Sequence, residues 1–318
     1  MLYPPFPLDK DTREAVEKET GLTGDEASQP AVIRDYTNKI LAVHPTSKVL
    51  KNDHEINVGG NNGKVQISVI RPVGVEDVIL PGILFIHGGA WMYGNYGTHC
   101  GVVHELVNRT PAVVVFVHYS LSPEHKYPLA LEQCYAALSW MVDNHESLYI
   151  NPQNIAVIGD SAGGNLSSAL TLLAQERMNE YVICCLVLYY PVLNDSFDDK
   201  SYQENEFDSI LSKEKMIYIW NAYCASSDRD KPTAVPFKAT QDQLKRFPPT
   251  LVITAEHDVL RDEGEQLANK LQQVGVVANS IRYYGVQHRF LTPANPQSKF
   301  DAAMEETVVM LKRTFELA

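Results

Sequence analysis

The sequence predicts an α/β protein whose mostly parallel β-sheet is covered by helices on both faces. Its strand-like stretches are near-continuous apolar runs, which is typical of strands buried on both sides. These runs alternate along the chain with helical stretches, the pattern of a parallel sheet with crossover helices. With 318 residues, 45% of them hydrophobic, the chain can bury a large core without metal or disulfide support.

The elements follow in a regular order. Residues 11–19 and 31–41 are expected to be helical, and residues 54–58 and 64–70 flank a Gly-Gly-Asn-Asn-Gly turn and predict a β-hairpin. Further strands are expected at 83–87, 112–119, 155–159, 185–190, 250–255 and 280–284. Helices are expected at 98–110, 130–144, 162–178, 263–275 and 297–317. The prediction is therefore a sheet of eight strands.

Residues 194–248 interrupt this alternation, because they contain charged and helical pieces but no convincing core strand. We expect this insertion and residues 1–50 to form a helical cap over the carboxyl edge of the sheet, where α/β folds bind ligands. The core would then consist of residues 51–193 and 249–318. The alternative is that the insertion packs on one face of the sheet.

Composition narrows the classes of partner and compartment. A net charge of −12 disfavours nucleic acid and gives no support for anionic membranes. The five cysteines are odd in number and lack a CxxC pair, and no run of 18 apolar residues predicts a membrane span. The first residues lack a secretory pattern, so we expect a cytoplasmic protein. A homodimer is left open.

The stretch Gly-Asp-Ser-Ala-Gly at 159–163 lies where an apolar strand meets a helix. A phosphate loop is disfavoured because Asn165 and Leu166 stand where GxxxxGK[ST] needs lysine and a hydroxyl residue. The pattern fits GxSxG, a sharp turn that exposes a nucleophilic serine, here Ser161. A tight turn without chemistry is the remaining alternative.

A serine nucleophile needs a base and an acid, which follow it in that fold class at later strand ends. His288 lies after the last predicted strand and is the expected base. Asp258 and Glu256 compete as the acid, and Asp258 is favoured because it lies farther into the loop. An oxyanion hole is expected from the N–H groups of Gly88, Gly89 and Ala162, with His87 bracing the loop.

Several motifs occur in one order, namely HGGAW (87–91), YSLSPEHKYP (119–128), GDSAGGNL (159–166), HDVLRDEG (257–264) and GVQHRF (285–290). On these motifs the chain resembles the hormone-sensitive-lipase-like esterases of the α/β-hydrolase superfamily. The resemblance implies an α/β-hydrolase fold and a triad of Ser161, Asp258 and His288, with Asp262 structural. It also implies a cap, no metal or organic cofactor, and a small ester with a short acyl chain as substrate.

Two positions depart from the family pattern. Ala90 replaces the third glycine of HGGG, with little expected loss, and Arg289 stands where glycine is frequent after the histidine. We expect Arg289 to point to solvent or to pair with an acidic residue. The alternatives are that it contacts a substrate carboxylate or lowers the pKa of His288. Trp91 and Asp160 adjoin the two turns as candidate substrate contacts, with core packing the alternative for Trp91.

The resulting hypothesis is a serine carboxylesterase. An amidase or lactamase with the same triad is the first alternative. Plant gibberellin receptors resemble these esterases, but they lack the triad histidine and bind a ligand under an N-terminal lid. The presence of His288 favours catalysis over such a receptor.

Overall fold

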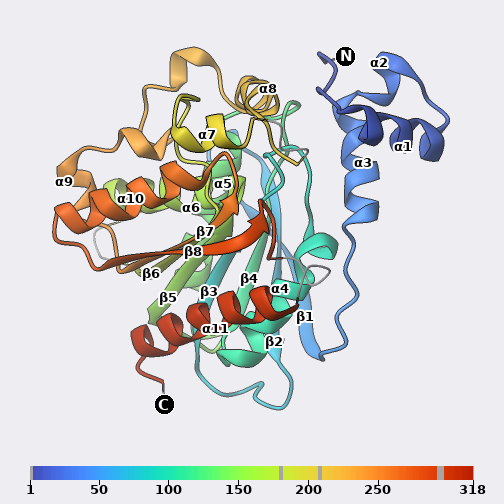
Figure 1. Ribbon diagram of the computed structural model, residues 1–318. Helices are drawn as coiled ribbons and strands as arrows, with labels where there is room; N and C mark the ends of the chain where they lie inside the picture. Colours follow the sequence, from blue (N-terminus) through green and yellow to red (C-terminus); the bar gives the residue numbers. More distant parts are fainter. Residues whose placement is uncertain (1–2, 179–181, 207–209, 292–296, 318) are drawn as a thin grey trace.

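The computed structural model describes residues 3–178, 182–206, 210–291 and 297–317. Its centre is one eight-stranded sheet in the order β1-β2-β4-β3-β5-β6-β7-β8 (Figure 1). The strands are β1 (Val49–Asn57), β2 (Lys64–Pro72), β3 (Leu80–Ile86), β4 (Val113–His118), β5 (Ile150–Asp160), β6 (Ile183–Tyr189), β7 (Thr250–His257) and β8 (Ala278–Gln287). β2 pairs antiparallel with β1 and β4, and every other pairing is parallel. The mostly parallel eight-stranded sheet is confirmed.

Helices cover both faces of the sheet, as its two-sided apolar strands require. Successive residues of β4 alternate between two buried clusters: Val113 and Val115 belong to one, Val114 and Phe116 to the other. The first cluster is completed by α5 (Leu129–Asp143), α6 (Ala162–Arg177) and α10 (Arg261–Gln273). The second is completed by α4 (Tyr96–Arg109) and α11 (Gln297–Thr314). The core is thus two apolar layers separated by the sheet.

The two segments outside this pattern contact each other. The N-terminal helices are α1 (Lys10–Thr20), α2 (Gly24–Ala27) and α3 (Pro30–Ile40), and the insertion carries α7 (Lys200–Glu204), α8 (Lys213–Tyr223) and α9 (Gln241–Leu244) (Figure 1). The Phe6 ring meets the Tyr218 ring of α8 edge to face, with 5.2 Å between centroids. Tyr218 Oη also donates a hydrogen bond to Pro4 O at 2.6 Å. The chain start is therefore fastened to α8.

Most strands are longer than the apolar runs that predict them, and β5 and β7 show why. β5 begins at Ile150, because Leu80 pairs with Ile150 before the register shifts. β7 continues to His257, which pairs with Gln287 of β8 beyond a second register shift. Glu256 therefore lies within β7, and Asp258 is the first residue after that strand.

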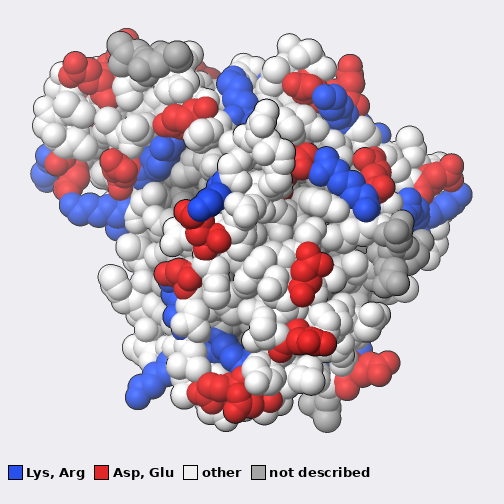
Figure 2. Space-filling model, turned by 180° about the vertical axis from the view of Figure 1, so that it is seen from behind, with Lys and Arg blue, Asp and Glu red and all other residues white. Residues whose placement is uncertain are grey.

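The surface mixes charges of both signs. Figure 2 shows acidic and basic side chains interspersed on one face, with uncharged surface between them. All five cysteines are free thiols. Within the described ranges, none of the helices combines the length and apolarity needed to span a bilayer.

Candidate active site

Ser161 sits on the sharp turn between β5 and α6. Its backbone has φ 53° and ψ −117°, a strained conformation for a residue with a side chain. Its N–H donates to Tyr189 O at 2.8 Å, and its carbonyl accepts from Val192 N at 3.1 Å, so the end of β6 holds the turn. A Cβ on Gly163 would lie 1.9 Å from Ile86 O. Glycine is therefore required there for the turn to approach β3.

Three side chains from separate elements form a buried hydrogen-bonded chain. His288 Nε2 lies 3.0 Å from Ser161 Oγ, and His288 Nδ1 lies 2.7 Å from Asp258 Oδ2. The second carboxylate oxygen of Asp258 accepts from Leu260 N–H at 2.9 Å, which fixes its orientation. All three residues are buried. The structure thus brings together the predicted nucleophile, base and acid, in the geometry that activates a serine hydroxyl.

The loop after β3 lies close to the turn that carries Ser161. One of the two backbone N–H groups predicted for the oxyanion hole in this loop already has a hydrogen-bond acceptor. Gly88 N–H donates to Asp160 Oδ1 at 2.8 Å. That donor is occupied, so its predicted place in the oxyanion hole is wrong for this geometry. The N–H groups of Gly89, Ala90 and Ala162 have no protein acceptor among the described residues. Gly89 and Ala90 adopt positive φ values of 113° and 55°, which turn this part of the loop sharply.

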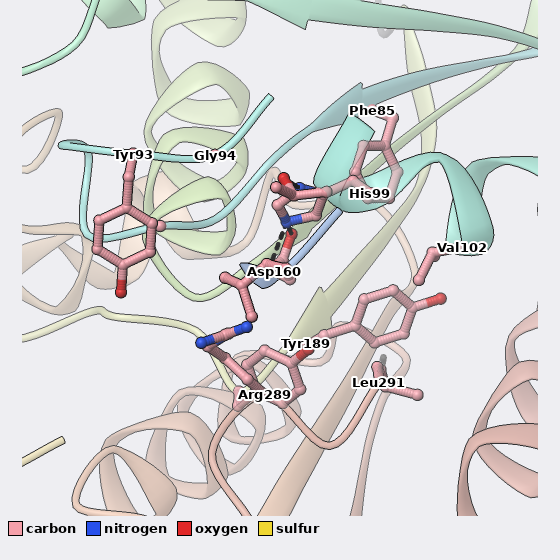
Figure 3. A pocket seen from close by; sticks show the side chains of 13 residues that line it. Phe85, Tyr93, Gly94, His99, Val102, Asp160, Tyr189, Arg289 and Leu291 are labelled. Atoms are coloured by element: carbon pink, nitrogen blue, oxygen red, sulfur yellow. Dashed lines mark hydrogen bonds and ion pairs between the residues drawn. The ribbon is translucent and has the colours of Figure 1, made fainter. Parts of the chain in front are cut away.

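Asp160 braces the two turns against each other. Besides Gly88 N–H, its carboxylate faces His99 Nε2 at 3.4 Å (Figure 3). Burial alone would raise the pKa of Asp160, but the His99 imidazole and the Gly88 N–H together bring it below its ordinary value. Asp160 also lines the pocket in Figure 3, beside the turn that carries Ser161. Its carboxylate is already engaged by protein donors.

His87 supports the same loop from within the core. Its ring stacks on Tyr119 at 4.2 Å between centroids, and burial lowers the pKa of His87 to about 3. The imidazole is therefore neutral at pH 7, and its Nδ1–H donates to Gly88 O at 2.7 Å. This arrangement agrees with the bracing role expected for His87.

Trp91 does not contact the cleft. It is fully buried and stacks face to face on Tyr223 of α8, with 3.9 Å between ring centroids. Its candidate role as a substrate contact is therefore wrong for this structure, and the packing alternative holds.

A cleft opens over Ser161 with ≈ 340 Å³ of empty space, its mouth included. Its lining residues are Gly89, Ala90, Tyr93, Ser161, Val192, Ile210, Leu211, Met216, Ile219, His288 and Arg289. Sequence reasoning missed the apolar walls from α8 and the residues just before it, since nothing in that segment marks which side chains face Ser161.

The described part of the chain holds no group of three or more His, Cys, Asp or Glu side chains arranged to hold a metal ion. The polar residues that line the cleft include Ser161, His288 and Arg289, and the loop residues Gly89 and Ala90 line it as well.

Comparisons with known proteins show which proteins this chain resembles. Residues 83–292 match a family model described as the α/β hydrolase fold. The chain is 37% identical to an α/β hydrolase of Acanthamoeba polyphaga mimivirus, over 81% of this chain and 75% of the relative. It is 35% identical to the carboxylesterase NlhH of Mycobacterium tuberculosis, over 67% and 66% of the two chains. A fungal esterase from Rhizomucor miehei superposes with a TM-score of 0.86 at 34% identity, covering 98% of both chains.

Proposed function

Since the chain belongs to the hormone-sensitive-lipase-like esterases of the α/β-hydrolase fold, we propose that it hydrolyses small carboxylic esters with Ser161 as nucleophile. The observation that carries this proposal is the buried chain of hydrogen bonds from Asp258 through His288 to Ser161, open to a cleft at the serine. Relatives named esterase, carboxylesterase and arylesterase support the same reaction.

The reaction begins when His288 takes the proton of Ser161 as its Oγ attacks the ester carbonyl. Asp258 accepts from His288 Nδ1–H and stabilises the imidazolium that forms. This role needs a carboxylate held in one orientation, which the Leu260 N–H bond to Asp258 supplies. The imidazolium then protonates the leaving alcohol, and an acyl-enzyme remains on Ser161.

The tetrahedral intermediate needs N–H donors aimed at its oxygen. We assign these to Gly89, Ala90 and Ala162, whose N–H groups lack protein acceptors in the described structure, in place of Gly88. Water then attacks the acyl-enzyme, with His288 as its base, and releases the acid. No step requires a metal or organic cofactor.

The walls of the cleft favour a short acyl chain. Met216 and Ile219 of α8 and Leu211 form apolar walls close to Ser161 and His288, which leaves little room for a long chain. We propose that the N-terminal helices and the insertion act as a cap over this cleft. Their contacts through Tyr218 support that assignment.

A series of p-nitrophenyl esters from C2 to C12 tests this proposal. We expect the highest kcat/KM for the short members, and a loss of about 10⁴-fold or more in kcat for Ser161→Ala, because triad members act as a unit. A matched arylamide series addresses the amidase alternative. Amide turnover above ester turnover, or full ester turnover by Ser161→Ala, would overturn the proposal.

A further inference from the structure

Arg289 occupies an unusual position beside the proposed base. It directly follows His288 and adopts a positive φ of 66°, where glycine is the residue that fits without strain. Such a conformation is strained for a residue with a side chain. The arginine side chain therefore stands at a backbone position that does not favour it.

The side chain turns inward rather than to solvent. Arg289 is half-buried and lines both the cleft over Ser161 and the neighbouring pocket, where it reaches in between Tyr93 and Tyr189 (Figure 3). The expectation that it points to solvent is wrong.

Its guanidinium also lacks an acidic partner within the described residues. Other partly buried arginines are paired: Arg261 contacts Glu204 at 2.7 Å, and Arg282 contacts Glu265 at 2.6 Å. The expected pairing of Arg289 with an acid is therefore wrong as well. A cation that loses water without gaining a counter-charge is destabilising, and an anion bound beside it would remove that penalty.

The acidic residues near Arg289 lie outside the cleft over Ser161, so an anion could bind to Arg289 within that cleft. Asp160 faces the other pocket, and its carboxylate is engaged by Gly88 N–H and His99. Asp258 is fully buried behind His288. The described walls of the cleft itself include Arg289 and no carboxylate side chain. The other side walls are largely apolar, including Val192 and Met216, and suit the carbon chain of a ligand.

We propose that Arg289 binds a carboxylate of the substrate, so that the enzyme prefers esters carrying a negative charge a few bonds from the scissile carbonyl. This inference rests on the proposed esterase function. The planar guanidinium fork matches a carboxylate with two parallel hydrogen bonds. The simplest substrate of this class is a half-ester of a short dicarboxylic acid, whose methylene groups would lie against the apolar walls.

Two isosteric pairs test the proposal on either side of the ester. Monoethyl glutarate and its neutral amide, ethyl glutaramate, place the charge in the acyl part. The pair 4-acetoxybenzoate and 4-acetoxybenzamide places it in the alcohol part. Turnover of each is followed at pH 7 by titration of the released acid, and the quantity compared is the anionic-to-neutral ratio of kcat/KM.

Arg289→Gln removes the charge, retains much of the side-chain length and leaves the backbone requirement unchanged. We expect it to lower the ratio about 10-fold or more for at least one pair, as removal of a partly buried charge partner does. Arg289→Lys should retain more of the ratio than Arg289→Gln. Higher salt should weaken the wild-type preference. The pair that responds identifies the side of the ester that carries the carboxylate.

Arg313→Gln is the matched control, because it removes an exposed arginine near the far end of α11. It should leave the ratio unchanged. If Arg289→Gln does not fold, Arg289→Gly replaces it in the same comparison, because glycine adopts the positive φ without strain. If the enzyme hydrolyses neutral esters and the anionic-to-neutral ratio of kcat/KM is the same in wild type and in the Arg289 variants, this inference is wrong and the esterase proposal stands. Failure to hydrolyse any ester would overturn both.

Discussion

Asp160 joins the nucleophile turn to the loop after β3, and its removal should damage both stability and rate. The side chain is 6% exposed, and its Oδ1 is the acceptor for Gly88 N–H at 2.8 Å. Asp160→Ala leaves that buried N–H without a partner, which costs about 1–3 kcal/mol. It also removes the charge that faces His99. We therefore expect a loss of about 1–3 kcal/mol in the free energy of unfolding.

The kinetic effect should appear in kcat. Gly89 and Ala90 follow Gly88 directly, so a shift of the loop moves the proposed oxyanion donors away from the reacting oxygen. A misplacement of about 1 Å can cost about 100-fold in rate. Asp160→Asn keeps an acceptor oxygen for Gly88 N–H and loses only the charge. Its losses in the free energy of unfolding and in kcat should therefore be smaller than those of Asp160→Ala.

Urea unfolding and steady-state kinetics on p-nitrophenyl acetate measure the two effects. The pKa of Asp160 is below its ordinary value in the folded protein, so its stabilisation is present at pH 7 and is lost as pH falls through that lowered folded pKa. The difference between wild type and Asp160→Ala should therefore narrow in acid. A variant with normal stability and kcat but a raised KM would refute this reasoning and make Asp160 a substrate contact.

Three further changes probe other parts of the molecule. Gly163→Ala places a Cβ 1.9 Å from Ile86 O, so we expect little folded protein, or a variant without esterase activity, as judged by circular dichroism and ester turnover. His87→Phe keeps a ring against Tyr119 and removes a group whose pKa falls to about 3 in the folded state. Below pH 6.5 the unfolded chain gains a proton at His87 that the folded protein does not accept. Stability is therefore lost on acidification, and the drop in unfolding free energy from pH 7 to 5 should be about 2 kcal/mol smaller in the variant. Phe6→Ala removes the ring contact with Tyr218, and limited proteolysis should then cut the N-terminal segment faster while the core resists; an unchanged cleavage rate would contradict a docked chain start.

The central part of the sheet was predictable because its strands are buried on both faces. Residues 112–119 form a short, nearly continuous apolar run rich in valine, which is typical of a strand buried on both faces. Helical stretches separate such runs along the chain. The extra length of β5 was not predictable, since the polar residues 151–154 carry no strand pattern. Pairing of Ile150 with Leu80 extends that strand, and a partner strand cannot be read from a local window.

The placement of Ser161, Asp258 and His288 was predictable because strand order brings their turns to one edge of the sheet. The oxyanion donors were not, because a motif does not show where each amide points. Gly88 is diverted by Asp160, which lies 72 residues away in the chain. Trp91 is likewise explained by Tyr223, a stacking partner from the insertion. The inward turn of Arg289 depends on a positive φ that arginine itself does not suggest.

The hydrogen bond from Tyr218 to Pro4 links the chain start to α8, the helix that lines the cleft. Tyr218 belongs to the same helix as Met216 and Ile219, which form a wall of the cleft, whereas every reacting group comes from turns at the sheet edge. This apolar wall of the cleft and the reacting groups therefore lie on separate elements. A fusion partner or neighbouring protein that displaced the first residues would move a wall of the cleft without moving the triad. Such a change would alter which esters enter the cleft while kcat for the esters that do enter stays the same.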